Sequence, residues 1–396
     1  MLTPILSRHL KLSICICLMS THQFVIGCTF LFSSIILAKL KEPTSTIKIT
    51  HEEGSWIASL PVLICPIGLL VLGILSDKFG RRKALQVGYI PIIISWLVLS
   101  YSYSLKSIVI ARFILGTAFG SGACVYLYVS EVAPTKYRPL YLSLVTMFVG
   151  LGMMFESVIS IFIEWRTWAL ILFVLSTVNC LSMFLVPESY VWLRAHGRIR
   201  EAEATEKMLG IEPAAATAVP VPAPVTALAV NGDEHMGGAD GTGKSDSVAY
   251  WRKFAGPTVW KPTLITMLFF ICQQGSGFYV LLFYSVDVLH SCRVQWDGIT
   301  VTAFLSIARL FGSLVYSMLH HVHRKTLVLV SGGGMGLSLT TIIVYMHMYD
   351  DVADPPYGAL LIVAFISYMF FAMLAMLPMP WTICGEVFPM SVKGFV

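Results

Sequence analysis

Charged residues are scarce in this sequence. Asp, Glu, Lys and Arg account for 12% of its 396 residues, whereas hydrophobic residues account for 56%. Soluble domains carry roughly 25% charged residues, so this composition argues against an ordinary soluble enzyme. Four long stretches, residues 54–76, 84–105, 262–286 and 355–385, contain no charged residue at all. Because about 20 apolar residues cross a bilayer, the chain is predicted to be an all-α membrane protein with several spans.

Disulfide pairs, metal-binding clusters and a basic face are also missing. The nine cysteines are odd in number and lie mostly inside apolar runs, which is typical of small buried residues. The net charge is +5, but Lys and Arg fall between the apolar runs, as membrane topology requires. Neither a metal, a cofactor nor a nucleic-acid partner is therefore expected. Residues 238–245 match a P-loop pattern but follow an Ala/Pro tract rather than a strand, so no nucleotide is expected either.

The apolar runs predict about ten membrane-spanning helices, because each run is longer than a strand of a membrane barrel. The helices are expected to begin near residues 12, 54, 84, 107, 139, 167, 259, 300, 326 and 356. The first run continues to Ala38 and is too long for a cleaved signal peptide. A cytoplasmic N-terminus places most of the 27 Lys and Arg residues on the cytoplasmic side, which the positive-inside rule favours.

The segment 187–258 divides the predicted spans into six and four. It begins amphipathic and charged and then turns into Ala/Pro and Gly/Asp tracts. This composition predicts a short cytoplasmic helix followed by a flexible linker. The expected organisation is a bundle of six helices in residues 1–186 and a bundle of four in residues 259–396.

A loop pattern recurs with a period of six helices. An acid, a proline and a base follow both the fourth and the tenth span with the same spacing: Glu131, Pro134 and Arg138, then Glu386, Pro389 and Lys393. Duplicated bundles are a transporter architecture in which the substrate binds between the two halves. Two spans follow Arg138 in the first half, so the second half is expected to be incomplete by two helices.

Several motifs resemble the sugar porters of the major facilitator superfamily, particularly the insect trehalose and glucose transporters. Residues 73–83 resemble the superfamily loop between helices two and three, and residues 187–189 resemble the motif after helix six. Tyr128, Glu131, Pro134 and Arg138 resemble the sugar-porter signature after helix four. Residues 273–277 and 378–381 resemble helices seven and ten. The resemblance implies pseudo-symmetric bundles of six plus six helices, here six plus four, in a plasma-membrane sugar transporter.

The candidate substrate site combines amide and aromatic side chains. A sugar offers hydroxyl groups that donate and accept hydrogen bonds, together with an apolar face. The candidate residues are Gln273, Gln274, Trp381 and Tyr284. The resemblance places the two glutamines at the sugar, and the prolines beside Trp381 favour a helix break at a gate. Each also has a structural interpretation. The glutamines can bond a neighbouring helix, Trp381 can lie in an interfacial belt, and packing is the favoured role of Tyr284.

Charged residues near the predicted cytoplasmic ends suggest a gate. The resemblance implies that they form ion pairs between the bundles in one state and release them when the halves rock. This set comprises Asp77, Arg81, Arg82, Glu131, Arg138, Arg324 and Glu386. Positive-inside topology alone explains Arg81 and Arg82 but not the repeated acids.

Two arginines fall inside predicted spans. Arg112 resembles a family arginine that packs against the loop containing Asp77. Arg309 is costly in a span unless it is paired or faces a wet cavity, and a functional and a structural role both stay open.

The expected function is facilitative uniport of trehalose or a hexose by alternating access. Proton-driven relatives carry an acid on the first span, and residues 12–38 contain no Asp or Glu. Two other readings stay open: a truncated, non-transporting isoform, fragment or sugar-binding receptor, and a transporter of another small solute.

Overall fold

A computed structural model describes residues 2–43, 45–211, 257–292, 296–319, 321–349 and 356–387. Within these residues the chain is helical throughout and contains no strand. The elements are α1 (Leu2–Lys41), α2 (His51–Phe79), α3 (Arg81–Ser100), α4 (Leu105–Ala118), α5 (Ser121–Val132), α6 (Arg138–Phe162), α7 (Trp165–Ser182), η1 (Met183–Leu185), α8 (Tyr190–Ala195), α9 (Ile199–Leu209), α11 (Pro257–Gly275), α12 (Phe278–Phe283), α13 (Ser285–Ser291), α14 (Gly298–Met318), α15 (Arg324–Met348), α16 (Gly358–Phe371), η3 (Ala372–Met376) and α17 (Pro378–Val387).

Nine helices of the described chain are long and apolar enough to cross a membrane. They begin within a few residues of nine of the ten predicted starts, so the all-α membrane fold is confirmed. The remaining run, the seventh in the chain, was predicted from residue 259 and occurs instead as three consecutive shorter helices, α11, α12 and α13. Gly277, with φ +81°, separates the first two, a conformation that only glycine adopts without strain.

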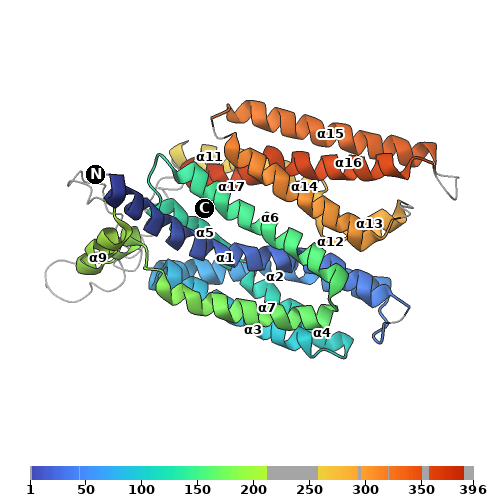
Figure 1. Cartoon of the computed structure of the whole chain (residues 1–396), viewed down its shortest axis with the longest axis horizontal. Coiled ribbons are helices and arrows are strands. Elements are labelled where there is room, and N and C mark those ends of the chain that lie inside the picture. The colour runs from blue at the N-terminus through green and yellow to red at the C-terminus, as the bar shows by residue number, and fades with distance from the viewer. Residues whose placement is uncertain are drawn as a thin grey trace, which may run out of the picture.

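Two groups of helices lie side by side along the long axis (Figure 1). We call α1–α7 the first half and α11–α17 the second half. The main contact between the halves is made by α6 and α14. The end of the molecule that carries α9 is called the α9 end, and the opposite end, beside α13, is called the α13 end. The predicted linker falls largely on residues 212–256, which lie outside the described chain.

Close helix crossings hold the first half together. Where α1 crosses α6, a Cβ added at Gly27 would lie 2.2 Å from the carbonyl oxygen of Val149, and one at Gly152 would lie 2.1 Å from that of Phe24. Small residues at such crossings let two backbones approach, which is how helices gain packing energy in lipid.

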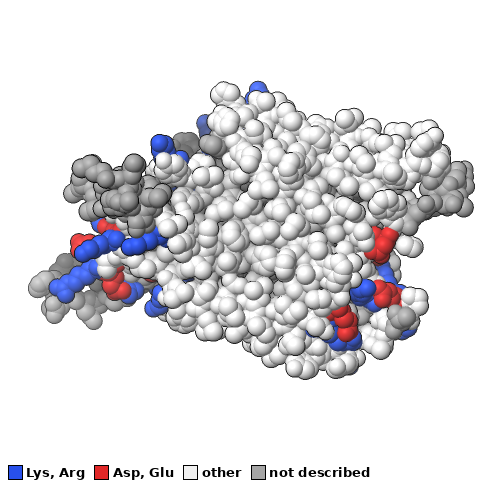
Figure 2. Space-filling model, viewed as in Figure 1, with Lys and Arg blue, Asp and Glu red and all other residues white. Residues whose placement is uncertain are grey.

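Most side chains on the outer surface are apolar. Leu70 and Ile74 on α2, for example, are 72% and 66% exposed. Charged side chains gather toward the two ends and leave a broad uncharged band between them (Figure 2). This distribution is the one a bilayer requires, because it keeps charge in water at both surfaces.

Candidate functional site

The two predicted glutamines are neighbours near the end of α11 and point in different directions, one into the protein and the other outward. Gln273 is buried, and its Nε2 donates a hydrogen bond of 3.2 Å to the carbonyl oxygen of Leu377. Its Oε1 has no hydrogen-bond partner in the described chain. Gln274 is exposed. The structure therefore separates the roles of the two residues, with Gln273 alone offering a free acceptor in the interior.

Trp381 joins the second half to the first. Its ring stacks on Tyr126 of α5, with centroids 5.8 Å apart and an interplanar angle of 18°. It also meets the edge of Phe270 on α11 at 5.2 Å, and it stays 41% exposed. Tyr126 in turn shares a hydrogen bond of 3.2 Å with Thr146 of α6. Sequence reasoning left Tyr126 out of the site, although an aromatic residue inside the helix-four signature was an available signal.

The helix around Trp381 departs from regular α geometry. Residues Ala372–Met376 form a π-helical segment between α16 and α17. Such segments arise where one extra residue is inserted in a helix, and they frequently occur at functional sites. Ser331 of α15 binds both ends of the π-helical segment. Its hydroxyl donates to the carbonyl oxygen of Phe371 at 2.6 Å and accepts from the amide of Met376 at 3.0 Å.

Tyr284 lies apart from Gln273 and Trp381. It separates α12 from α13, and its hydroxyl donates to the carbonyl oxygen of Ser55 on α2 at 3.4 Å. The four predicted site residues are thus not gathered at one place. Tyr284 belongs instead to a set of contacts that joins the halves at the α13 end.

Two further contacts complete that set. Ser34 of α1 and Ser285 of α13 share a hydrogen bond of 2.8 Å, and both side chains are buried. Lys41 at the end of α1 forms an ion pair of 2.8 Å with Asp287 of α13. Sequence reasoning missed these residues, because nothing in their local pattern relates the end of the first span to a segment about 250 residues further on.

Most of the predicted gate residues meet at the α9 end, within the first half. Nε and Nη2 of Arg81 donate to Glu131 of α5 at 3.1 and 2.8 Å, and Nη1 donates to Asp77 at 2.7 Å. The carboxylate of Glu188 accepts the backbone amides of Arg81 and Arg82, at 2.9 and 3.1 Å, and so caps the start of α3. These contacts fasten the turn between α2 and α3 to α5 and to the segment before α8.

The other predicted gate residues lie outside this cluster. The Arg138 side chain donates to the carbonyl oxygen of Ala133 at 3.4 Å, within its own loop. Arg324 begins α15 in the second half, and Glu386 lies in α17 with a side chain outside the described atoms. The ion pairs formed by Asp77, Arg81 and Glu131 therefore lie inside one half in this structure.

The expected packing of Arg112 against the Asp77 loop is wrong. Arg112 is fully buried, its Nε donates to the carbonyl oxygen of Ile57 at 3.0 Å, and its Nη2 donates to the hydroxyl of Ser33. Ile57 and Asp77 are separated by about 30 Å along α2, at 1.5 Å per residue. The resemblance identified a buried arginine correctly but placed it at the wrong end of the bundle.

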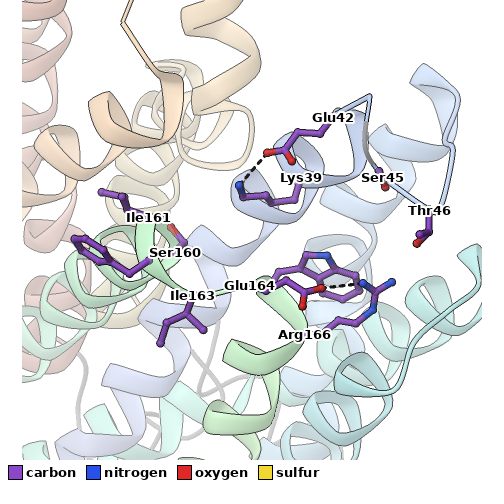
Figure 3. Close-up of a pocket in the computed structure, with 11 residues that line it drawn as sticks. Lys39, Glu42, Ser45, Thr46, Ser160, Ile161, Ile163, Glu164 and Arg166 are labelled. Carbon is purple, nitrogen blue, oxygen red and sulfur yellow. Dashed lines mark hydrogen bonds and ion pairs between the residues drawn. The ribbon is translucent and has the colours of Figure 1, made fainter.

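Two surface pockets lie at opposite ends of the molecule, and the one at the α9 end is lined in part by Arg82 and Glu188. One of about 400 Å³ opens at the α13 end between α1, α6 and α7, and is flanked by the ion pairs Lys39–Glu42 and Glu164–Arg166 (Figure 3). The other, of about 260 Å³, lies at the α9 end beside α9. On its wall, hydrogen bonds from Arg198 lower the pKa of the Glu201 carboxyl. In the described chain no group of three His, Cys, Asp or Glu residues is placed to hold a metal.

The arrangement of the helices is that of the major facilitator superfamily. The chain superposes on the proton:xylose symporter XylE, bound to 6-bromo-6-deoxy-D-glucose, with a TM-score of 0.71 and 17% identity, covering 98% of this chain and 84% of that one. An inward-open structure of the Escherichia coli xylose transporter XylE matches with a TM-score of 0.66 and 18% identity, covering 97% and 84% of the two chains.

Residues 14–396 match the family model described as "Sugar (and other) transporter", and the chain belongs to this family of membrane transporters. Family membership places it among transporters rather than enzymes. It is 27% identical over 347 residues to plastidic glucose transporter 4 of Arabidopsis thaliana, covering 86% of this chain and 60% of that protein. It is 24% identical over 381 residues to the facilitated trehalose transporter Tret1 of Anopheles gambiae, covering 95% and 46%. The chain thus spans 60% of the length of the first of these relatives and 46% of the second.

Proposed function

We propose that this chain carries a sugar, trehalose or a hexose, across the plasma membrane by facilitative uniport, with its N-terminus in the cytoplasm. Residues 1–186 and 259–396 act as the two bundles that rock about the substrate. The relatives named as glucose and trehalose transporters support the choice of substrates. The first span, Leu10–Lys41, contains no Asp or Glu, which supports transport without a coupled proton.

The observation that carries the proposal is the way the halves meet at either side of the helix break. Toward the α9 end the contact is a ring stack, Trp381 on Tyr126. Toward the α13 end it comprises the Tyr284–Ser55 hydrogen bond, the pair Ser34–Ser285 and the ion pair Lys41–Asp287. Each set is small and polar or aromatic, so one can separate while the other holds. Such alternation is the requirement of a carrier that opens to one side at a time.

Gln273 and Trp381 have the chemistry to hold the sugar between these contacts. Gln273 offers an unpartnered amide oxygen in the interior, and Trp381 offers a partly exposed ring only one helical turn from Leu377, to which Gln273 donates. An amide and an aromatic plate match the hydroxyl groups and the apolar face of a pyranose. In this proposal the Asp77, Arg81 and Glu131 cluster keeps the first half rigid while the two halves move.

The test is uptake of radiolabelled trehalose and glucose into proteoliposomes that contain the purified chain. We expect saturable uptake that equilibrates without accumulating and is reduced roughly three- to tenfold by Gln273→Ala, the range expected for one lost hydrogen bond. Trp260→Ala changes an exposed tryptophan on the same helix and serves as the control. Accumulation above equilibrium under an inward proton gradient would contradict uniport, and binding without uptake would indicate a receptor.

A further inference from the structure

Among the residues that the structure describes, Arg309 is a buried cation with no carboxylate paired to it. It lies near the middle of α14 and is 0% exposed. Its Nε lies 3.3 Å from the sulfur of Met369, and its Nη1 lies 4.0 Å from that of Met153. Within the described chain its Nη2 has no hydrogen-bond partner, and its one electrostatic partner is a tyrosine, Tyr368, rather than a carboxylate. Thioether sulfur is a weak acceptor, so the donors of this guanidinium are largely unsatisfied.

The other arginine inside a span, Arg112, has stronger acceptors than Arg309, although its Nη1 also lacks a hydrogen-bond partner in the described chain. Arg112 donates to a backbone carbonyl oxygen and to the hydroxyl of Ser33. It also interacts electrostatically with Glu156, a carboxyl group that is buried in the same half. An arginine remains charged at physiological pH, and it is costly inside a membrane unless it is paired or faces a wet cavity. Arg309 therefore requires an anion that the described chain does not supply.

The surroundings of Arg309 connect it to the proposed substrate route. Its guanidinium lies 5.7 Å from the ring centre of Phe278, the first residue after the break between α11 and α12. Tyr368, one residue before Met369, donates a hydrogen bond of 2.8 Å to the carbonyl oxygen of Ser276 inside that break. Met153 belongs to α6 of the first half. Arg309 thus lies where the interface between the halves meets a broken helix, the place where carriers of this architecture bind their substrates.

Rocking of the two halves would change what covers the guanidinium. Met153 moves with α6, whereas Met369 and Phe278 move with the half that carries Arg309. Separation of α6 from α14 therefore withdraws one thioether and leaves the Nη1 and Nη2 donors facing the opening. A planar guanidinium with two free N–H groups on one side binds a carboxylate through two parallel hydrogen bonds.

We propose that Arg309 is an anion-binding site on the solute route and that the chain accepts a monosaccharide bearing a carboxylate, a hexuronate, as a further substrate. This inference rests on the proposed transport function and adds a substrate class to it. A neutral hexose leaves the cation unpaired, whereas a hexuronate of nearly the same shape supplies the missing charge.

The experiment compares uptake of radiolabelled glucuronate and glucose into proteoliposomes by the full chain, Arg309→Gln and Arg309→Lys. Glucuronate is expected to enter and to compete with glucose in the unmodified chain. Arg309→Gln should lower the ratio of glucuronate to glucose uptake at least about tenfold, and Arg309→Lys should lower it less, because a lysine retains the charge but not the paired geometry. Arg166→Gln removes one positive charge at the α13 end and should leave the ratio unchanged.

Failure of this inference and failure of the proposed function have different signatures. Glucose uptake without glucuronate entry or competition overturns the anion site and leaves sugar transport standing. Glucuronate uptake without glucose or trehalose uptake overturns the proposed transport of neutral sugars and leaves the anion site standing. If Arg309→Gln does not fold, the melting temperature of the unmodified chain decides the matter. Millimolar sodium glucuronate should raise it more than glucose or sodium chloride at the same concentration, and equal shifts would refute the site.

Discussion

The ion pair between Arg81 and Glu131 offers a sharp test of how the first half is held together. The two side chains are 10% and 5% exposed, and their closest atoms are 2.8 Å apart. Arg81 also pairs with Asp77 and donates to the carbonyl oxygen of Ser76 at 2.8 Å. The hydroxyl of Ser189 donates to the second oxygen of Glu131. Removal of Arg81 leaves Glu131 buried without an ion-pair partner, whereas removal of Glu131 leaves buried Arg81 with Asp77, which is 39% exposed, as its remaining charged partner.

The expected magnitude follows from this burial. Loss of one partner of a buried pair costs about 3–5 kcal/mol, because the remaining charge stays in a poorly solvated position. Glu131→Gln keeps an amide oxygen for one hydrogen bond, so its expected cost in unfolding free energy is near 3 kcal/mol. Arg81→Met strands both Glu131 and Asp77, so its cost is near 5 kcal/mol. The double variant Arg81→Met with Glu131→Gln removes both charges of this pair and should cost less than Arg81→Met alone.

The assay is reversible unfolding in mixed micelles of dodecyl maltoside and dodecyl sulfate, followed by circular dichroism. Glu201→Gln removes the exposed partner of Arg198 and should leave the transition unchanged, since exposed pairs contribute little. Single-variant costs below about 1 kcal/mol would refute the reasoning, and so would a double variant whose cost equals the sum of the two single costs.

Three further predictions concern other parts of the chain. The charge reversal Lys41→Asp should favour separation of the halves at the α13 end by a factor of up to about five, which is the effect expected for an exposed ion pair. Adding Asp287→Lys should restore the contact. Distances between spin labels on α1 and α13 measure the separation. Gly80→Ala should lower the unfolding free energy by about 1–3 kcal/mol, because φ is +104° and the new Cβ would lie 2.4 Å from Glu188. Gly197→Ala is the control: its φ is +73° but its Cβ would have no neighbour, so it should cost less in the same unfolding assay. Trp168→Phe should lower the unfolding free energy by about 1–3 kcal/mol, because it removes the indole N–H that donates to buried Glu156. Adding Glu156→Gln to this variant should not restore the lost stability.

The sequence predicted the helices well because a membrane imposes a local rule. Each span must be apolar over about 20 residues and must satisfy its own backbone, so hydropathy and length locate it without knowledge of its neighbours. The seventh run shows the limit of this rule. Its apolar length predicted one span, but the backbone conformation of Gly277 and the packing around it divided the run into α11, α12 and α13.

The candidate site was only partly predictable, because proximity between distant helices leaves little trace in local sequence. Motifs pointed to Gln273 and Trp381, but nothing in them distinguished buried Gln273 from exposed Gln274 or placed Tyr126 against Trp381. The charges at Asp77, Arg81 and Glu131 were recognised, and tertiary structure decided that they pair within one half.

By itself the sequence determined that the chain is helical, that it crosses a membrane repeatedly and that it belongs among sugar porters by its motifs. Composition and short motifs carry this information, since the bilayer acts on every span separately. Only the tertiary structure decided which buried charges have partners. Arg112 and Arg309 look alike in sequence, each a single cation in an apolar run. Yet Arg112 donates to a carbonyl oxygen and a hydroxyl, while Arg309 contacts two thioethers and an aromatic ring. That difference depends on how helices far apart in the chain pack together, which no local pattern encodes.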